Sequence, residues 1–524
     1  MDAFGWLAAH LGYVPWIFVG YFALINTSLL MLTALAAGEF VAHARRSRFH
    51  GYDDVFTSAL TTPVSVLMPA YNERAGIVEA VRAMASLRYP EYEVVVIDDG
   101  STDGTLKALS EGFDLVEIPK MVPADVPTIG EVESVYVSRQ GARNVMVVRK
   151  VNGGKADALN AGINLARYPL LCMVDADSLL DPDALLHVTR PFANDPDRVV
   201  TTGGVVRAAN GCVVRAGRVT EVRMPTTWLP RIQVVEYLRA FLIGRTGWSR
   251  LGALLIISGA FGLFRRDLVV EAGGMAHGCI GEDAELVVRL HRMLAETDRK
   301  HRMVFVAEPV AWTEVPDSRA VLGSQRRRWQ RGITEILLRH RRMIGNPRYG
   351  TVGLLAMPWF VLFEVLAPFV ELAGWLYLLW IAVVNSLAMT GIFGIEPIDT
   401  TLALWPLATS WGYSLLLTVV SMALEEFSFR RYRRRRDLAI AVAAAIAENI
   451  GFRQLTAWWR VRGTLQALWR TTPHWGVMTR NGFASAPDQS AVLTLPRQRN
   501  VSEEVAGDLP DPRATLPTRQ ASRE

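Results

Sequence analysis

Residues Leu170-Leu171-Cys172-Met173-Val174 form a short apolar run that ends in Asp175-Ala176-Asp177. A run of this length bounded by polar residues is typical of a buried strand. Three upstream segments have a similar apolar, β-branched character: 64–70, 93–97 and 144–149. The sequences at 73–87 and 155–166 read as helices between them. Strands alternating with helices predict an α/β fold with a mostly parallel sheet, whose ligands bind at the carboxyl ends of the strands.

The pair Asp175 and Asp177 predicts a metal site. Two carboxylates this close repel each other unless a cation lies between them. Oxygen ligands together with substrate phosphates suit Mg²⁺ or Mn²⁺, and such an ion would neutralise a leaving diphosphate. A D-x-D pair is also common by chance, so the prediction depends on its place at the end of a strand.

Three turns have the composition of a nucleotide site. Asn72 and Glu73 follow the first strand, and Asp98 and Asp99 end the second, directly before a glycine. Carboxylates accept hydrogen bonds from a base or a ribose, and glycine lets the backbone approach a ligand. Lys155 follows a glycine pair and opens a helix, which suits a diphosphate because backbone N–H groups and a positive helix end meet there. Ordinary turns with helix caps remain the alternative.

Asp283 follows Gly281-Glu282 at the start of a helical segment that runs to about residue 294. Acids stabilise the first turn of any helix, so this position has a purely structural explanation. The functional interpretation is a general base that takes a proton from an acceptor hydroxyl. We assign that role to Asp283, with Glu282 as the alternative.

Residues 325–329 read Gln-Arg-Arg-Arg-Trp, a Q-x-x-R-W pattern. Arg328 is suited to hold a diphosphate with two parallel hydrogen bonds. Trp329 offers a flat apolar face to a sugar ring, and Gln325 can hydrogen-bond sugar hydroxyls. The competing interpretation is a basic amphipathic helix on lipid headgroups, which the neighbouring arginines also fit.

Residues 11–38 carry no charge and exceed the roughly 20 residues that cross a bilayer. Arg45, Arg46 and Arg48 follow, so the positive-inside rule places the next domain in the cytoplasm.

A second apolar region follows the Q-x-x-R-W pattern. We expect crossings near 370–394 and 401–424, with 350–367 in the interface, because arginines at 430–436 again mark the cytoplasmic side. The chain should therefore be a multi-pass protein of the inner or plasma membrane.

Four regions are expected: an N-terminal membrane helix with a basic linker (1–50), a cytoplasmic domain (51–345), interfacial and membrane helices (346–480) and a disordered tail (481–524). The net charge of +5 comes from arginine clusters beside apolar segments, which indicates a membrane surface and no nucleic-acid partner. The 3 cysteines have no metal-type spacing, so neither a disulfide framework nor a zinc site is expected.

The acidic motifs in this order, followed by Q-x-x-R-W, resemble the processive family 2 glycosyltransferases, such as the bacterial poly-N-acetylglucosamine, chitooligosaccharide and hyaluronan synthases. The resemblance covers roughly residues 60–345 and implies a GT-A fold and inverting transfer from a UDP-sugar, UDP-GlcNAc or UDP-Glc. It also implies roles for particular residues: Asn72, Glu73, Asp98, Asp99, Lys155 and Asp175 toward the UDP-sugar, Asp177 on the metal, Asp283 as the base, and Gln325, Arg328 and Trp329 at the diphosphate and the acceptor's end.

Two alternatives to a synthase remain open. Glycosyltransferases that add a single sugar to a lipid carry a similar motif set. A catalytically silent membrane receptor on the same scaffold is disfavoured, because the acids and the Q-x-x-R-W pattern are intact. Few membrane segments are expected, so an export channel would need an accessory subunit or a second copy of the chain.

Overall fold

The computed structural model describes residues 14–46, 61–139, 144–215, 217–390, 397–398, 400–429 and 435–469. The chain divides into two compact units, Met1–Ala484 and Ser485–Glu524. The second unit, which contains nearly all of the tail predicted at 481–524, lies outside the described residues. Everything below concerns the first unit.

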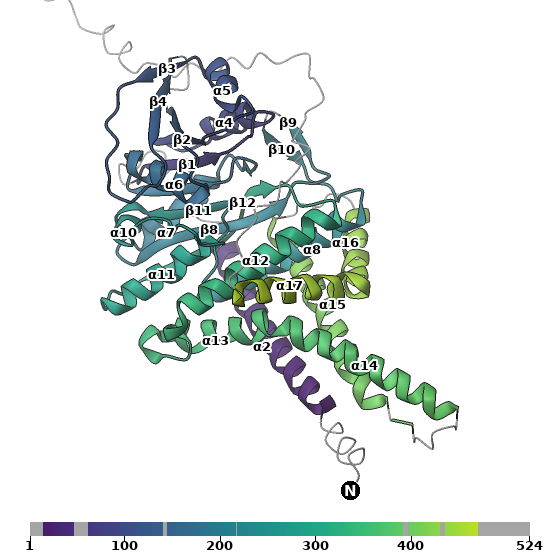
Figure 1. Cartoon of the computed structure of the whole chain (residues 1–524). Coiled ribbons are helices and arrows are strands. Elements are labelled where there is room, and N and C mark those ends of the chain that lie inside the picture. The colour runs from purple at the N-terminus through teal and green to yellow at the C-terminus, as the bar shows by residue number, and fades with distance from the viewer. Residues whose placement is uncertain are drawn as a thin grey trace, which may run out of the picture. The chain divides into compact units, whose positions relative to one another are not determined.

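A large mixed sheet is the centre of the fold (Figure 1). Its ten strands lie in the order β3-β4-β5-β2-β1-β6-β11-β8-β12-β7. The bounds are β1 Val64–Ala70, β2 Tyr92–Asp99, β3 Leu115–Ile118, β4 Val132–Ser138, β5 Val145–Lys150, β6 Leu170–Val174, β7 Leu179–Leu180, β8 Val199–Ala208, β11 Phe261–Arg265 and β12 Arg302–Thr313. A separate hairpin joins β9 (Val213–Arg215) and β10 (Arg218–Glu221).

The strands β5, β2, β1 and β6 run parallel and are nearly all buried. Strand β11 pairs antiparallel with both β6 and β8, and β3 and β4 add antiparallel strands at the opposite edge. Helices connect the parallel strands, as a parallel sheet requires. The predicted α/β class, with a GT-A-type sheet and flanking helices, is confirmed.

The helices next to the sheet are α4 Ile77–Ala85, α5 Thr105–Phe113, α6 Lys155–Leu165, α7 Ala184–Asn194, α10 Arg266–Glu271 and α11 Glu282–Glu296. Helix α4 begins later than the predicted 73–87, because Asn72 adopts a left-handed φ of 57° and Glu73 lies in a turn. Helix α6 packs on β1 and β2, where a Cβ at Gly162 would lie 2.9 Å from Ile97 Cδ1. This close approach packs the C-terminal half of α6 against the sheet.

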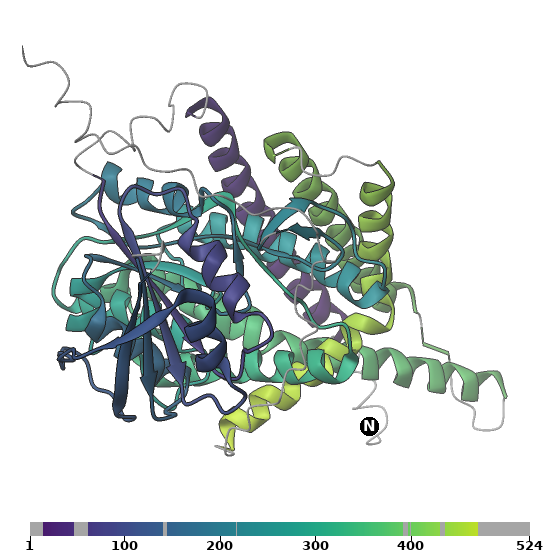
Figure 2. The same cartoon turned by 90° about the horizontal axis from the view of Figure 1, so that it is seen from above.

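The remaining helical elements lie on the other side of the site. They are α2 Val14–Arg46, α8 Trp228–Tyr237, η1 Leu238–Arg245, α9 Thr246–Arg250, α12 Arg319–Arg339, η2 Arg341–Met343, η3 Pro347–Tyr349, η4 Val352–Ala356, α13 Met357–Phe360, η5 Val361–Val365, α14 Ala367–Met389, α15 Thr401–Phe429, α16 Arg435–Ala447, η6 Glu448–Phe452 and α17 Arg453–Leu468. Helix α2 packs beside α15 and η1, and α17 packs along α12 (Figures 1 and 2).

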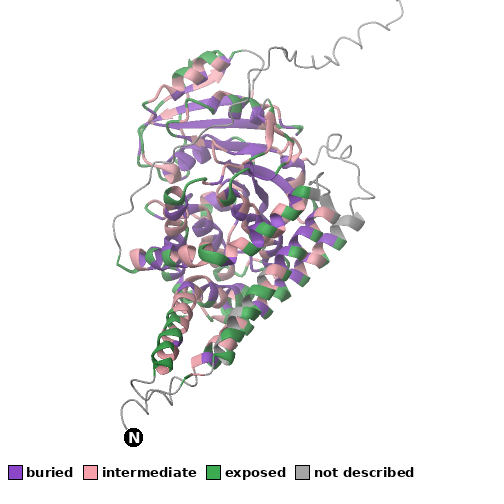
Figure 3. Cartoon of the chain, turned by 90° about the vertical axis from the view of Figure 1, so that its right-hand side faces the viewer, coloured by how far each residue is buried: buried purple, intermediate pink, exposed green. Residues whose placement is uncertain are grey.

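Among the described residues, three helices are long and apolar enough to cross a membrane: Val14–Val41, Val352–Met389 and Arg436–Leu468. Ile17 in α2 and Leu376 in α14 are 68% and 66% exposed. Figure 3 shows this contrast between the buried sheet and the exposed helices near the N-terminus. Apolar side chains exposed in this way suit contact with lipid.

These spans differ in part from the predicted crossings. The stretch Val352–Met389 joins the predicted interfacial segment at 350–367 to the predicted crossing at 370–394. The crossing expected at 401–424 falls within helix α15, which is not one of these three spans, so this crossing stays a prediction. The third candidate is bent, because Ile450 and Gly451 leave the helical conformation. Its first part, α16, has 13 residues, fewer than the roughly 20 that cross a bilayer, so we do not count it as a straight crossing.

Candidate active site

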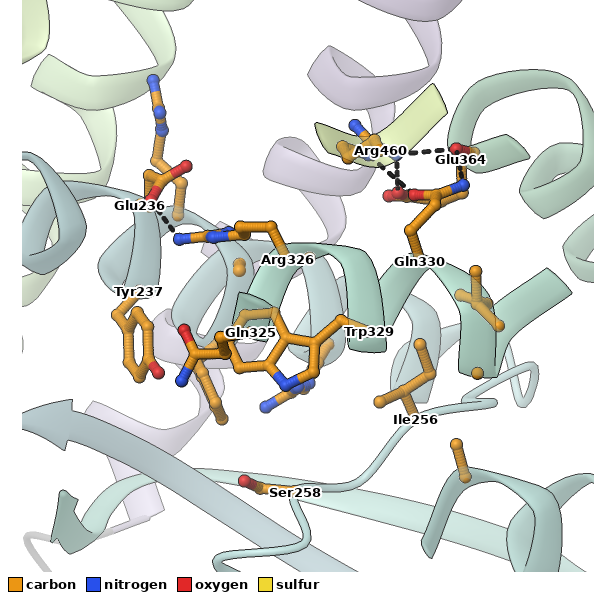
Figure 4. Close-up of a pocket in the computed structure, with 18 of the residues that line it drawn as sticks. Glu236, Tyr237, Ile256, Ser258, Gln325, Arg326, Trp329, Gln330, Glu364 and Arg460 are labelled. Atoms are coloured by element: carbon orange, nitrogen blue, oxygen red, sulfur yellow. Dashed lines mark hydrogen bonds and ion pairs between the residues drawn. The ribbon is translucent and has the colours of Figure 1, made fainter. Parts of the chain in front are cut away.

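One cavity of about 980 Å³ lies between the carboxyl ends of the strands and the helices α2, η1 and α12 (Figure 4). It brings together most of the predicted site residues: Lys155, Asp175, Asp177, Asp283, Gln325, Arg328 and Trp329. They come from positions up to 174 residues apart in the sequence, from Lys155 to Trp329. The other predicted residues, Asn72, Glu73, Asp98 and Asp99, lie at the ends of β1 and β2 and do not line this cavity.

Lys155 stands at the centre of an acidic cluster. Its Nζ atom lies 2.5 Å from Asp175 Oδ1 and 3.5 Å from Glu282 Oε1. Burial lowers the pKa of Lys155, but the carboxylates of Asp175, Glu282 and Asp283 outweigh burial and raise the pKa above its ordinary value. Lys155 is therefore a permanent cation, placed where α6 begins after Gly154, whose φ is 87°. The backbone N–H groups of Gly153 and Gly154, which we predicted would bind a diphosphate together with Lys155, donate to Asp99 instead, and the role of Lys155 toward a diphosphate stays a prediction.

Asp283 is the acid whose environment best suits proton transfer. Burial and the charge of Glu282 raise the pKa of Asp283 while Lys155 opposes both effects, and the resulting pKa is about 6. A carboxyl group with a pKa near the working pH can both accept and release a proton. The loop at Gly259 closes over this group, since a Cβ there would lie 3.1 Å from Asp283 Oδ2 and 3.3 Å from Lys155 Nζ.

Asp175 and Asp177 both line the cavity, and carboxylate oxygens are ligands that a hard cation prefers. The described residues hold no group of three or more acids, histidines or cysteines arranged for a metal. Two carboxylates alone are a weak cage for Mg²⁺ or Mn²⁺, but they fit an ion that takes its other ligands from substrate phosphates and water. The donor set therefore fits a cation that arrives with its nucleotide.

The carboxylates of Asp98 and Asp99 bond to protein groups. Asp99 accepts from Lys150 Nζ at 2.6 Å and from the backbone N–H groups of Gly153 and Gly154 at 3.0 and 2.8 Å. Lys150 is fully buried and also lies 2.7 Å from Asp157 on α6. Asp98 accepts from Arg149 at 2.5 Å. Asp99 thus holds the glycine pair that precedes Lys155, and direct contact of either acid with UDP stays a prediction.

The turn after β1 is tied to the turn after β2. Asn72 Oδ1 accepts from the N–H of Thr102 at 2.8 Å, and the N–H of Asn72 donates to Ser101 Oγ at 2.9 Å. The N–H of Glu73 donates to Thr105 Oγ1 at 3.0 Å. The two predicted nucleotide turns therefore form one surface at the edge of the sheet. Binding of UDP by these turns stays a prediction.

The Q-x-x-R-W residues lie on α12, which begins with Ser318 as its N-cap. Trp329 is 44% exposed, and its ring centroid is 6.5 Å from that of Tyr237. Arg326 lies over the Trp329 ring at 5.0 Å and pairs with Glu236 at 2.5 Å. Gln325 is buried, and its Oε1 has no hydrogen-bond partner among the described residues. The two rings and the amide suit a sugar, whose faces are apolar and whose edges are polar.

Gln330, directly after Trp329, connects α12 to the apolar helices. Its Nε2 donates to the carbonyl of Glu364 at 3.0 Å and to Thr464 Oγ1 at 3.2 Å. Arg460 on α17 donates to Gln330 Oε1 at 2.8 Å and to Glu364 Oε2 at 2.6 Å, as Figure 4 shows. The position of Trp329 therefore depends on α17 and η5.

Sequence reasoning missed Arg245, which lines the same cavity at the end of η1. Its Nη1 is buried without a hydrogen-bond partner. A single cation in the otherwise apolar sequence of residues 240–248 was the available signal, because an isolated charge in such a segment is costly and is commonly functional.

Comparison with protein families gave two matches. The model described as "Glycosyltransferase like family 2" matches residues 62–332, more than half of the 524-residue chain. A chitin synthase model matches residues 276–425.

Similar proteins include the poly-beta-1,6-N-acetyl-D-glucosamine synthases of Staphylococcus aureus (strain COL) and Staphylococcus epidermidis. They are 29% and 28% identical over 278 residues, which is 53% of this chain and 56% of each relative. The match thus spans about half the length of these relatives.

Solved structures with a similar backbone include a mannosyltransferase, PcManGT from Pyrobaculum calidifontis, in complex with GDP-Man and Mn²⁺. It has a TM-score of 0.45 and 18% identity, covering 86% of this chain and 99% of that one. S. aureus TarS 1-349 in complex with UDP-GlcNAc has a TM-score of 0.35 and 15% identity, covering 75% and 92%.

Proposed function

Because the chain belongs to the family described as glycosyltransferase-like family 2, we propose that it is a membrane-embedded, inverting transferase that adds N-acetylglucosamine from UDP-GlcNAc to a growing β-linked glycan. The poly-beta-1,6-N-acetyl-D-glucosamine synthases, which match about half of this chain, support UDP-GlcNAc as the donor. The chitin synthase match at residues 276–425 supports a polymeric product.

The observation that carries the proposal is the continuity of the cavity. The same space is lined by Asp175 and Asp283 at the sheet and by Phe22, Trp359 and Glu364 on the apolar helices. A site for one soluble acceptor would not need walls from α2 and η5. A chain that leaves the site toward the membrane would use them.

On the donor side, Lys155 would hold the diphosphate, with Arg328 as a second cation. Asp175 and Asp177 would hold Mg²⁺ or Mn²⁺, which when bound neutralises charge on the leaving diphosphate. Lys155 is paired with Asp175. Binding of phosphate would exchange one anionic partner of Lys155 for another.

On the acceptor side, Trp329 and Tyr237 would stack on the terminal sugar, and Gln325 would bind its hydroxyls. Asp283 would take the proton of the attacking hydroxyl as that oxygen bonds to C1 of the donor sugar. The C1–O bond to UDP breaks on the opposite face, so an α-linked donor gives a β-linkage. The proton ends on the Asp283 carboxylate.

A lipid acceptor is the second candidate, because Phe22, Ile25 and Phe363 give the cavity an apolar wall.

We also propose three features of the chain's organisation. These are the cytoplasmic orientation of residues 51–345, the division into regions at 50, 345 and 480, and an accessory subunit or second copy of the chain. Orientation is measurable with reporters: one near Pro397 should be external and one after residue 436 internal, and the reverse would refute the orientation.

The test of function is UDP release and product analysis. Purified full-length protein in lipid should release UDP from UDP-GlcNAc faster than from UDP-Glc and make polymer. A single addition to a lipid, never extended, would replace the synthase proposal by the lipid candidate. No UDP release from any UDP-sugar would refute both.

A further inference from the structure

Arg245 differs from the other cations of the cavity. Within the described residues it forms neither a hydrogen bond nor an ion pair, and its buried Nη1 has no partner. Other cations that line the cavity are paired: Lys155 with Asp175, Arg326 with Glu236, Arg239 with Glu448, and Arg460 with Glu364. The buried Nη1 donates to no protein acceptor, which is a demand for a ligand.

The charge of Arg245 persists at neutral pH. Burial lowers the pKa of Arg245 to about 10, while the charges of Asp283 and Tyr237 act in the opposite direction. A buried charge without a partner costs free energy, and such groups concentrate at functional sites. The cost falls when a ligand supplies the missing acceptor.

The position of Arg245 places it beside the acceptor. Helix η1 packs against α2 and α15, the apolar helices, whereas Lys155 and Asp175 lie on the sheet side. Asp283, the proposed base, is close enough to raise the pKa of Arg245. A group bound by Arg245 would therefore belong to the sugar that provides the attacking hydroxyl.

The surroundings of Arg245 select the chemistry of that group. The guanidinium carbon lies 3.6 Å from the centroid of the Phe241 ring and 6.0 Å from that of Phe305. Ile257 and Trp248 also line the cavity. A strong hydrogen-bond donor beside apolar walls complements an acetamido group, whose carbonyl accepts from N–H and whose methyl group packs on apolar carbon. A hydroxyl group in the same place would accept the hydrogen bond from Arg245 but would not pack on the apolar walls.

A second orphaned polar atom supports a ligand of this kind. Gln325 Oε1 is a buried acceptor without a partner in the same cavity. The cavity thus offers an unused donor and an unused acceptor, and a sugar carries partners for both.

We propose that Arg245 binds the acetamido carbonyl of the acceptor's terminal sugar and so selects an N-acetylated chain end. The proposal rests on the function proposed above, since it assumes a glycan acceptor.

The experiment measures acceptor binding without transfer. Full-length protein in lipid receives UDP and Mg²⁺ but no donor sugar, and oligosaccharide binding is followed by tryptophan fluorescence, because Trp329 and Trp248 line the cavity. The ligands are a β-1,6-linked N-acetylglucosamine pentasaccharide and the corresponding glucose pentasaccharide, which is also neutral. The variants are Arg245→Gln, Arg245→Lys and the control Arg265→Gln, whose arginine is paired with Asp267 away from the cavity.

We expect Arg245→Gln to weaken binding of the acetylated chain by roughly 10- to 100-fold, the worth of one hydrogen bond to a charged donor. The glucose chain should lose less than about threefold by the same reasoning. Arg245→Lys should fall between, and Arg265→Gln should match the wild type. Equal losses for both chains, or no loss, would overturn the proposal. Loss of UDP affinity in Arg245→Gln would also overturn it, by placing the residue on the donor side.

The proposed function and the role of Arg245 can be refuted independently of each other. If the wild type makes polymer from UDP-GlcNAc while Arg245→Gln does not distinguish the two chains, only the role of Arg245 is wrong. If the wild type makes no polymer and binds neither chain, the function itself is wrong.

Discussion

Replacing Asp283 by Asn should abolish transfer while making the protein more stable near neutral pH. The side chain keeps its size and loses its charge, so binding of UDP-GlcNAc should change little. The transfer rate should fall by roughly 10²- to 10⁴-fold, the usual contribution of a positioned base. A residue needed for folding would behave in the opposite way.

The size of the stability gain follows from the burial of Asp283. The pKa of this carboxyl rises from 3.8 to about 6, chiefly through burial. At 1.36 kcal/mol per pKa unit, a rise of about two units costs the folded protein about 3 kcal/mol when Asp283 is ionised. Because the folded pKa is raised, this cost is absent below pH 3.8, grows between 3.8 and about 6, and is complete above pH 6.

The same titration sets the pH dependence of the reaction. Only ionised Asp283 can accept a proton, so the rate of the wild type should halve near pH 6 and fall to about a tenth at pH 5. UDP release and thermal unfolding, measured from pH 5 to 8 on wild type, Asp283→Asn and Glu282→Gln, test both effects. Normal elongation by Asp283→Asn, or an equal loss in Glu282→Gln, would refute the assignment of the base.

Three further predictions concern other parts of the site. Chelation with EDTA should stop turnover and Mg²⁺ or Mn²⁺ should restore it, while Asp177→Asn should weaken metal-dependent UDP binding; full activity in EDTA would exclude the metal. Lys150→Met should destabilise the protein by about 3–5 kcal/mol in denaturant unfolding, because it leaves Asp99 and Asp157 buried without their cation; an unchanged midpoint would contradict that network. Trp329→Ala should preserve hydrolysis of the donor but shorten the product on gels, and full-length polymer would remove Trp329 from the acceptor platform.

Local patterns were enough to predict the parallel strands and the acids at their ends. The strand at 170–174 is β6, and the helix predicted at 155–166 is α6, one residue shorter. Each depends on a hydrophobic pattern within a few residues, which packing against the sheet then reinforces. The start of α4 was predicted too early because the left-handed Asn72 turn depends on bonds to Ser101 and Thr102, 29 and 30 residues away.

The motifs did not predict which groups form hydrogen bonds with the predicted acids. D-D-G-S places two carboxylates at a strand end, but only the fold places Lys150 and the Gly153-Gly154 backbone around Asp99. A motif gives only the order of residue types along the chain. The hydrogen-bond partners of a carboxylate depend on which strands pair in the folded sheet. The hydrogen-bond partners of Asp99 therefore depend on the pairing of β2 with β5.

The same argument explains why the motif does not reveal the hydrogen bonds between α12 and the apolar helices. Q-x-x-R-W ends at Trp329, yet the next residue, Gln330, bonds Glu364 and Arg460, 34 and 130 positions away. α12 and α17 approach so closely that a Cβ at Gly463 would lie 2.6 Å from the Arg327 carbonyl oxygen. A shift of α17 would therefore move the backbone that carries Trp329. The proposed stacking platform for the acceptor is thus linked through Gln330 to η5, one of the walls along which we propose that the product leaves.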